Sequence, residues 1–171
     1  LLVAGGPPAD RLHADPEARR LRDLAARLGV GDHVRLLGTV ARPEVPALLR
    51  SADVAVCVPW YEPFGIVPLE AMACGVPVVG SAVGGLLDTV VHRSTGLLVP
   101  PRDPDAIAGA IHRLLDNPSL RVRMGEEAAA RVRQHFTWDQ VACSTLEVYE
   151  RLRAQLTVPT TDDSWAVTAC R

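Results

Sequence analysis

Residues 54–75 read VAVCVPWYEPFGIVPLEAMACG, and this stretch sets the expected fold. The apolar run Val54–Val58 predicts a buried strand, because strands covered on both faces are continuously hydrophobic. A loop follows, and a helix is expected to begin near Gly65, with Pro68 in its first turn, where a missing N–H has little effect. Gly75 ends that helix. The order of strand, loop and helix indicates a βα unit of a parallel sheet.

The same alternation of short apolar runs and helical patterns extends along the chain. Three of the helices carry a capping Asp or Asn directly before a proline, which is a helix-start signal. The pattern predicts an α/β fold, a doubly wound, Rossmann-like parallel sheet with helices on both faces. We expect one domain over residues 1–156 and a disordered polar tail over residues 157–171. Strands are expected at residues 1–4, 34–37, 54–58, 76–79 and 97–99, and helices near Asp15, Pro43, Gly65, Leu86, Asp103, Asn117 and Thr137.

Composition excludes several function classes. A formal net charge of −2 over 171 residues gives no case for binding nucleic acid. All 18 basic residues are arginine, so lysine Schiff-base chemistry and a Walker-type phosphate lysine are excluded. No apolar run reaches the roughly 18 residues that span a membrane. The four cysteines lack Cys-x-x-Cys spacing, which favours reduced thiols and a cytoplasmic location.

Two acidic residues stand around the expected start of the helix at Gly65. Glu62 lies in the preceding loop, and Glu70 is expected on an apolar, buried face of the helix. No Arg or Lys occurs between Ser51 and His92, so neither acid has a local salt bridge. A buried carboxylate needs hydrogen-bond partners. Sugar or ribose hydroxyls would suit both acids, and backbone N–H groups of a neighbouring loop are the alternative for Glu70.

Free backbone amides are the second part of the predicted site. The N–H groups of Gly65, Ile66 and Val67 are expected to point over the strand ends, where they can bind an anion or a hydroxyl. A second glycine-rich loop, residues 80–85, follows the next strand. In parallel sheets ligands bind outside the carboxyl ends of the strands, so this loop is expected to face the same cleft.

Four ordered segments carry a resemblance to a known family. Residues 62–65, 70–79, 83–85 and 95–99 read EPFG, EAMACGVPVV, VGG and TGLLV. They resemble the E-x7-E signature region of the retaining family-4 glycosyltransferases, which have the GT-B architecture. The resemblance covers residues 1 to about 156, which is nearly all of the chain. It implies the C-terminal, donor-binding half of a GT-B fold and transfer of a hexose from a nucleotide diphosphate sugar to an acceptor, with retention.

The resemblance also implies a role for each matching residue. Glu62 would contact the donor sugar and be essential for transfer, and Glu70 would hydrogen-bond the ribose hydroxyls. Family members are generally metal-independent, so no metal and no other cofactor is expected. The remaining donor contacts would come from Phe64, Gly65, Ile66, Val67, Gly84 and Gly85, and the contacts to the base from Gly38, Thr39 and Val40.

One departure from the family concerns the start of the chain. The basic pair that grips the diphosphate in this family matches a segment upstream of Leu1, as does the N-terminal acceptor-binding domain. We therefore expect that domain as a partner within the same protein, together with weak donor binding and no transfer by residues 1–171 alone. Peripheral membrane association through that domain is compatible with the resemblance.

Three alternative functions share part of the pattern. A GT-B nucleotide-sugar epimerase has the same architecture but uses acid and base groups from two domains. A non-catalytic nucleotide-sugar-binding module would need only the donor contacts. A dinucleotide-dependent dehydrogenase is disfavoured, because residues 4–9 read AGGPPA and lack the G-x-G-x-x-G fingerprint.

Several side chains near these elements have a structural explanation. Trp60 and Tyr61 are expected to pack at the strand end, with a role in a sugar or acceptor pocket as the alternative. Trp138 is expected to dock the last helix on the core. His92 is expected in a surface loop. The arginines from residue 113 to residue 133 are expected to form a solvated helix face.

Overall fold

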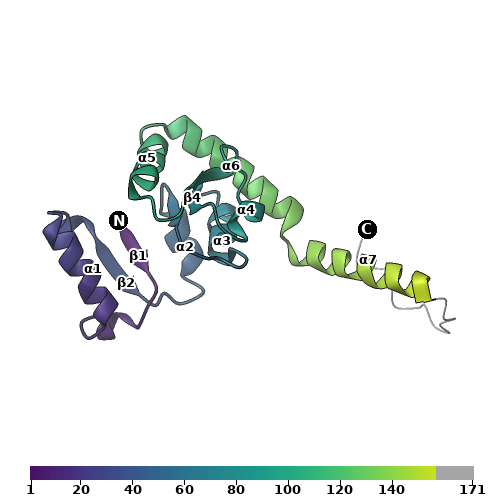
Figure 1. Ribbon diagram of the computed structural model, residues 1–171, viewed down its shortest axis with the longest axis horizontal. Helices are drawn as coiled ribbons and strands as arrows, with labels where there is room; N and C mark the ends of the chain where they lie inside the picture. Colours follow the sequence, from purple (N-terminus) through teal and green to yellow (C-terminus); the bar gives the residue numbers. More distant parts are fainter. Residues whose placement is uncertain (157–171) are drawn as a thin grey trace. The chain divides into compact units, whose positions relative to one another are not determined.

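The computed structural model describes residues 1–156. The chain folds as two compact units, Leu1–Leu48 and the residues from Leu49 onward, and Figure 1 gives their elements. The expected disordered tail, 157–171, lies outside the described residues. The single domain expected over residues 1–156 stays a prediction.

The first unit contains a two-stranded parallel sheet and one long helix. Strand β1 (Leu2–Ala4) pairs with β2 (Arg35–Gly38). Between them lies α1 (Pro16–Arg27), whose start was predicted from its cap. The Asp15 carboxylate accepts a hydrogen bond of 2.8 Å from the amide of Ala18. The remaining elements are the 3-10 turns η1 (Ala9–Arg11) and η2 (Gly31–His33), and α2 (Val45–Arg50) contains the boundary with the second unit.

The second unit contains a three-stranded parallel sheet in the order β3-β4-β5. Two of its helices begin at predicted caps, because Asp103 accepts from the amide of Ala106 at 2.9 Å and Asn117 from that of Leu120 at 2.9 Å. The strands are β3 (Ala55–Cys57), β4 (Val78–Ser81) and β5 (Gly96–Val99), and the helices are α3 (Ile66–Ala73), α4 (Leu86–Thr89), α5 (Pro104–Leu115), α6 (Pro118–His135) and α7 (Trp138–Leu156).

The core of this unit has two faces, because neighbouring residues of a strand point to opposite sides of the sheet. Val78 packs with Met72 of α3 and Leu86 of α4 on one face. Val79 packs with Leu114 of α5 and Met124 of α6 on the other. Figure 1 shows β4 between α3 and α5. The predicted parallel α/β fold with helices on both faces is confirmed, although its strands form two sheets, one in each unit, rather than a single sheet.

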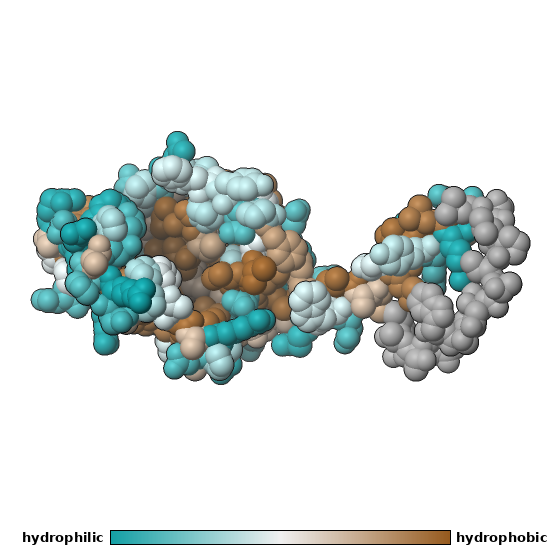
Figure 2. Space-filling model, turned by 90° about the horizontal axis from the view of Figure 1, so that it is seen from below, coloured by the Kyte–Doolittle hydropathy of each residue, from teal (hydrophilic) through white to brown (hydrophobic). Residues whose placement is uncertain are grey.

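Helix α7 exposes Trp138, which was expected to dock it, together with other apolar residues. Trp138 is 87% exposed, and Val141 and Tyr149 are 50% and 65% exposed. Brown apolar surface is visible along this helix in Figure 2. The prediction that Trp138 packs in the core is therefore wrong. A helix-start signal in the sequence does not indicate whether an aromatic residue there packs against another element.

Cys57 and Cys74 form no disulfide, which agrees with the expected reduced thiols at these two residues. Within residues 1–156, no helix combines the length and apolar character needed to cross a membrane.

Helices α3 and α6 approach each other through glycine. Gly75 follows α3 with a φ of 76°, a left-handed conformation that suits glycine. A methyl group on Gly125 of α6 would overlap the carbonyl oxygen of Gly75. The two backbones can lie this close only because Gly125 carries no side chain.

Replacing Gly125 by alanine is therefore expected to lower the free energy of unfolding by about 1–3 kcal/mol, the usual effect of overpacking. Chemical denaturation of the chain measures this change. The matched control is Gly109→Ala in the middle of α5, where a methyl group meets nothing within 4 Å. That change is expected to raise the free energy of unfolding by about 0.5–1 kcal/mol, because alanine suits a helix interior better than glycine. Equal effects of the two substitutions would contradict this account of the packing.

Candidate donor-binding site at the carboxyl end of the second sheet

The N-terminus of α3 is the centre of the predicted site. Of the three amides expected to be free there, that of Gly65 instead donates to the Glu62 carboxylate, and those of Ile66 and Val67 are free. Gly65 caps the helix in a left-handed conformation, with a φ of 93°. The amides of Ile66 and Val67 lie in the first helical turn, where backbone N–H groups have no partner within the helix. No hydrogen bond found within residues 1–156 uses either of these two amides. They are free to donate to a ligand.

Glu62 contacts this helix terminus directly. Its Oε1 accepts hydrogen bonds from the amide of Gly65 at 2.9 Å and of Phe64 at 3.4 Å. The sequence excluded only a local salt bridge for Glu62, and the backbone of its own loop supplies the hydrogen-bond donors instead. A carboxylate has about four acceptor positions, so Oε2 can still accept from a ligand hydroxyl while Oε1 holds the group in place.

Glu70 has a different environment from the one predicted. It was expected on a buried helical face, but it is exposed, as is Val67 of the same turn. The α3 helix buries Pro68, Ala71 and Met72 instead. The error came from assigning the helix face by apolar residue type, because every side chain from Ile66 to Leu69 is apolar and periodicity cannot select a side. An exposed Glu70 needs no buried partner and is accessible to a ligand.

Gly84 and Gly85 lie against the Glu62 loop rather than across a gap from it. The amide of Gly85 donates to the carbonyl oxygen of Glu62 at 2.8 Å. A Cβ on Gly85 would come within 2.5 Å of the Phe64 backbone, and one on Gly84 would overlap the carbonyl of Glu62. These glycines were predicted to face the cleft and to contact the donor, which stays a prediction. The structure shows that the close approach of a neighbouring loop already requires them.

Three aromatic side chains of this loop are exposed. Trp60 is 71%, Tyr61 75% and Phe64 53% exposed, so the predicted packing of Trp60 and Tyr61 at the strand end is wrong. The guanidinium of Arg102, from the loop after β5, lies 4.2 Å from the centre of the Trp60 ring. Arg102 was not selected from the sequence, because it is distant from the motif and only the order of the strands brings it beside Trp60.

The residues predicted to bind the base belong to the first unit. Gly38, with a φ of 72°, is buried, and its carbonyl accepts from the amide of Gly5 at 2.8 Å. The hydroxyl of Thr39 donates to the carbonyl of Gly6 at 2.6 Å. Val40 is half-buried. The Gly5-Gly6 loop therefore supports these residues, although it was considered only as a missing dinucleotide fingerprint.

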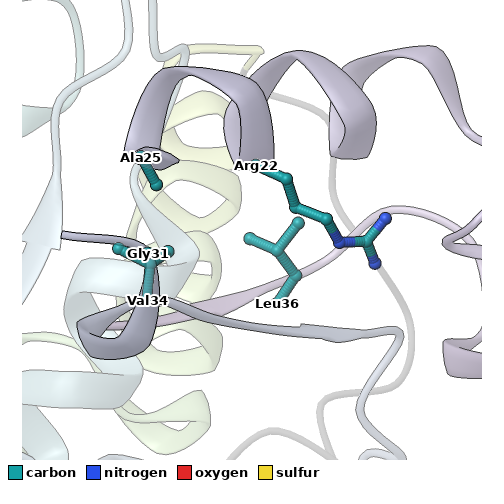
Figure 3. A pocket seen from close by; sticks show the side chains of 5 residues that line it. All are labelled: Arg22, Ala25, Gly31, Val34 and Leu36. Carbon is teal, nitrogen blue, oxygen red and sulfur yellow. The ribbon is translucent and has the colours of Figure 1, made fainter. Parts of the chain in front are cut away.

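Two cavities lie beside the sheet of the first unit. The first has a volume of about 300 Å³, and its lining includes Gly5, Gly6 and the acidic residues Asp15 and Glu17. It lies next to the predicted base-binding loop, because Thr39 of that loop is hydrogen-bonded to Gly6. The other, of about 170 Å³, is shown in Figure 3. It is formed at the amino end of β2, away from the strand ends where the predicted residues lie. Its lining residues are Arg22, Ala25, Gly31, Val34 and Leu36.

The histidine nearest the motif in sequence has a structural role. The ring nitrogen Nδ1 of His92 accepts from the amide of Leu98 at 3.0 Å. His92 is exposed, which agrees with the expected surface loop. Among residues 1–156, no three His, Cys, Asp or Glu side chains are grouped so that they could hold a metal ion.

The Cys57 thiol is electrostatically linked to the site. Cys57 ends β3, and burial raises its pKa above the ordinary value, with a smaller contribution from the negative charge of Glu62. Both effects disfavour the thiolate, which is the reactive form.

We expect Glu62→Gln to lower the pKa of Cys57, because one source of negative charge is removed. The thiolate fraction at mildly alkaline pH rises, and so does the rate of alkylation of Cys57 by iodoacetamide, followed by mass spectrometry. The rate–pH profile is expected to move to lower pH, while the rate at Cys74 stays unchanged. A faster reaction with an unmoved pH profile would indicate a loosened loop and would contradict the electrostatic link.

Known proteins with similar sequences were compared with this chain. The profile of the family described as glycosyl transferases group 1 matches residues 1–131. A D-inositol 3-phosphate glycosyltransferase of Streptomyces coelicolor is 45% identical, over 86% of this chain and 31% of that protein. An uncharacterized glycosyltransferase of Methanocaldococcus jannaschii is 43% identical, over 76% of this chain and 33% of that protein. The chain thus spans about a third of the length of these relatives.

Solved structures give the same result. A sucrose-phosphate synthase from Thermosynechococcus elongatus has a TM-score of 0.79 and 40% identity, covering 91% of this chain and 39% of that one. The Anabaena protein Alr3699/HepE, solved in complex with UDP-glucose, has a TM-score of 0.74 and 27% identity, covering 90% of this chain and 40% of that one. With its parallel sheets, its E-x7-E loop and these matches, the chain belongs to the glycosyl transferases group 1 family and has the fold of a GT-B glycosyltransferase.

Proposed function

We propose that this chain binds the nucleotide-sugar donor of a retaining hexosyltransferase. One observation carries the proposal: the N-terminus of α3 presents the open amides of Ile66 and Val67 beside the fixed carboxylate of Glu62. Backbone N–H groups at a helix start suit phosphate oxygens, and an oriented carboxylate suits sugar hydroxyls. A nucleotide diphosphate sugar contains both groups in one molecule.

Glu62 is assigned to the sugar and to the transition state. Its Oε1 is held by the amide of Gly65, and Oε2 would accept from a sugar hydroxyl. As the bond from the anomeric carbon to the diphosphate breaks, positive charge develops on the ring and negative charge on the leaving oxygens. A preorganised carboxylate and a helix N-terminus are placed to stabilise these two charges. The new glycosidic bond would form with retention, as in the family that the E-x7-E spacing resembles.

Glu70 is assigned to the ribose. It lies exposed in the second turn of α3, and its two oxygens match a pair of neighbouring hydroxyls. Gly38, Thr39 and Val40 are assigned to the base, and Gly84 and Gly85 to the loop that completes the donor site. No metal and no other cofactor is part of the proposal.

The similar proteins suggest which ligands to try first. HepE was solved with UDP-glucose, so we propose a UDP-sugar as the donor. The D-inositol 3-phosphate glycosyltransferase and the sucrose-phosphate synthase suggest a phosphorylated polyol or sugar as the acceptor. We propose that the acceptor is held by a further GT-B domain, corresponding to the two thirds of these relatives that the chain does not span.

Calorimetric titration of the chain with UDP, GDP and ADP tests donor binding. We expect UDP to bind most tightly and to raise the melting temperature, since a ligand that binds only the folded state stabilises it. Equal, unmeasurable binding of all three nucleotides would remove the support for a donor site in this chain.

The assigned roles of the two acids predict a split in affinity. Glu70→Gln is expected to weaken UDP and UDP-glucose alike, by about tenfold, the effect of losing a hydrogen bond to a charged group. Glu62→Gln is expected to weaken UDP-glucose by about the same factor and to leave UDP unchanged. Calorimetry on both variants measures this split.

Glu126→Gln on the exposed face of α6 is the matched control, and it should leave both affinities unchanged. A Glu62→Gln variant that loses UDP and UDP-glucose equally would contradict the assignment of Glu62 to the sugar.

A further inference from the structure

Arg131 of α6 lies outside the motif, but its guanidinium binds the end of α4. Nη2 donates to the carbonyl of Asp88 at 2.7 Å, and Nε donates to the carbonyl of Thr89 at 3.0 Å. The last carbonyls of a helix have no partner within it, so a planar guanidinium with two parallel donors fixes this terminus in position and orientation. The same guanidinium lies 5.4 Å from the centre of the Phe136 ring.

Thr89 transmits this restraint to the loop at the other end of α4. Its side chain is 1% exposed, and its hydroxyl donates to the carbonyl of Gly85 at 3.0 Å. It also packs closely on Gly65, because a Cβ built there would lie 3.3 Å from the Thr89 oxygen. Leu86, fully buried, would lie 3.5 Å from that same Cβ.

The Gly85 end of α4 in turn holds the Glu62 loop. The amide of Gly85 donates to the carbonyl of Glu62 at 2.8 Å, and the carboxylate of Glu62 is bonded to the amide of Gly65. A continuous series of contacts therefore runs from Arg131 through Thr89 and Gly85 to Glu62. Every member of the series except Arg131 is in α4 or in the two loops of the candidate site.

We propose that Arg131 is a positioning residue for the donor site, acting through α4 without touching the donor. This inference rests on the proposed function for its effect on binding, although the restraint itself exists without a ligand. Loss of the guanidinium frees two carbonyls at the end of α4, so the helix and the Gly84-Gly85 loop move more, and the Glu62 loop loses its support.

Hydrogen exchange of the amides of Gly85 and Gly65 tests the restraint in the ligand-free chain. Arg131→Gln is expected to raise exchange at these two amides by about tenfold, the effect of losing a hydrogen-bonded restraint. Amides of the central strand β4 should be unchanged. Arg131→Lys keeps the positive charge but has a single donor nitrogen in place of the planar guanidinium, and it is expected to restore part of the protection. Arg133→Gln, an exposed arginine of the same helix, is the matched control and should have no effect.

Thr89→Val provides a second variant of nearly the same shape. It removes the bond from the hydroxyl to the carbonyl of Gly85 and keeps the bond from the Thr89 amide to the same carbonyl. It is expected to raise exchange at Gly85 and Gly65 as well. For both variants, the dissociation constant of UDP-glucose should rise by about tenfold. Unchanged exchange at Gly65 and Gly85 in Arg131→Gln would overturn the proposal, as would an equal rise at β4, which would reveal a general loss of stability.

The two proposals fail in different ways. If the unmodified chain binds no nucleotide sugar, the proposed function fails, and the exchange rates still decide whether Arg131 restrains the loops. If exchange responds as expected but UDP-glucose affinity does not, Arg131 is only a structural residue and the positioning role is wrong.

Discussion

The contact between two loops, in which the amide of Gly85 donates to the carbonyl of Glu62, is the interaction on which the candidate site depends. It brings the loop after β4 against the loop after β3, and only glycine at residues 84 and 85 leaves room for it. This contact fixes the Glu62 loop, so that the Glu62 carboxylate can bind the amide of Gly65, the residue that caps α3. The same geometry leaves the amides of Ile66 and Val67 open. A glycine-rich loop thus supports a ligand site by allowing backbones to touch, before any ligand is considered.

The charge distribution around α3 follows from this arrangement. A helix N-terminus carries a partial positive charge, and the Glu62 carboxylate binds one amide of this terminus. That carboxylate satisfies the amide of Gly65, and the next two amides remain available in the same turn. The site therefore presents an acceptor for hydroxyls and donors for an anion side by side. Burial and the same carboxylate both keep the Cys57 thiol protonated, because they raise its pKa.

The sequence was sufficient for the elements and for the position of the motif. The caps at Asp15, Asp103 and Asn117 each predicted a helix start, because an Asp or Asn before proline satisfies a free amide at the first turn. The sequence was insufficient to predict on which side of a helix a residue lies. Glu70 was placed on the wrong side of α3, since a helix that is apolar over its first turns has no periodic signal to follow. The role of Arg131 was hidden for another reason: its partners are backbone carbonyls more than forty residues away, and carbonyl groups leave no trace in residue type.

The central claim is that the open amides at the start of α3 bind the donor diphosphate while Glu62 binds its sugar. Titration of the ¹⁵N-labelled chain with UDP-glucose, followed by the amide resonances, tests it most directly. The account predicts that the resonances of Ile66 and Val67 shift most, and that those of Gly65 and Gly85 shift with them at the same ligand concentrations. Saturable shifts confined to residues away from α3, with Ile66 and Val67 unmoved, would contradict it.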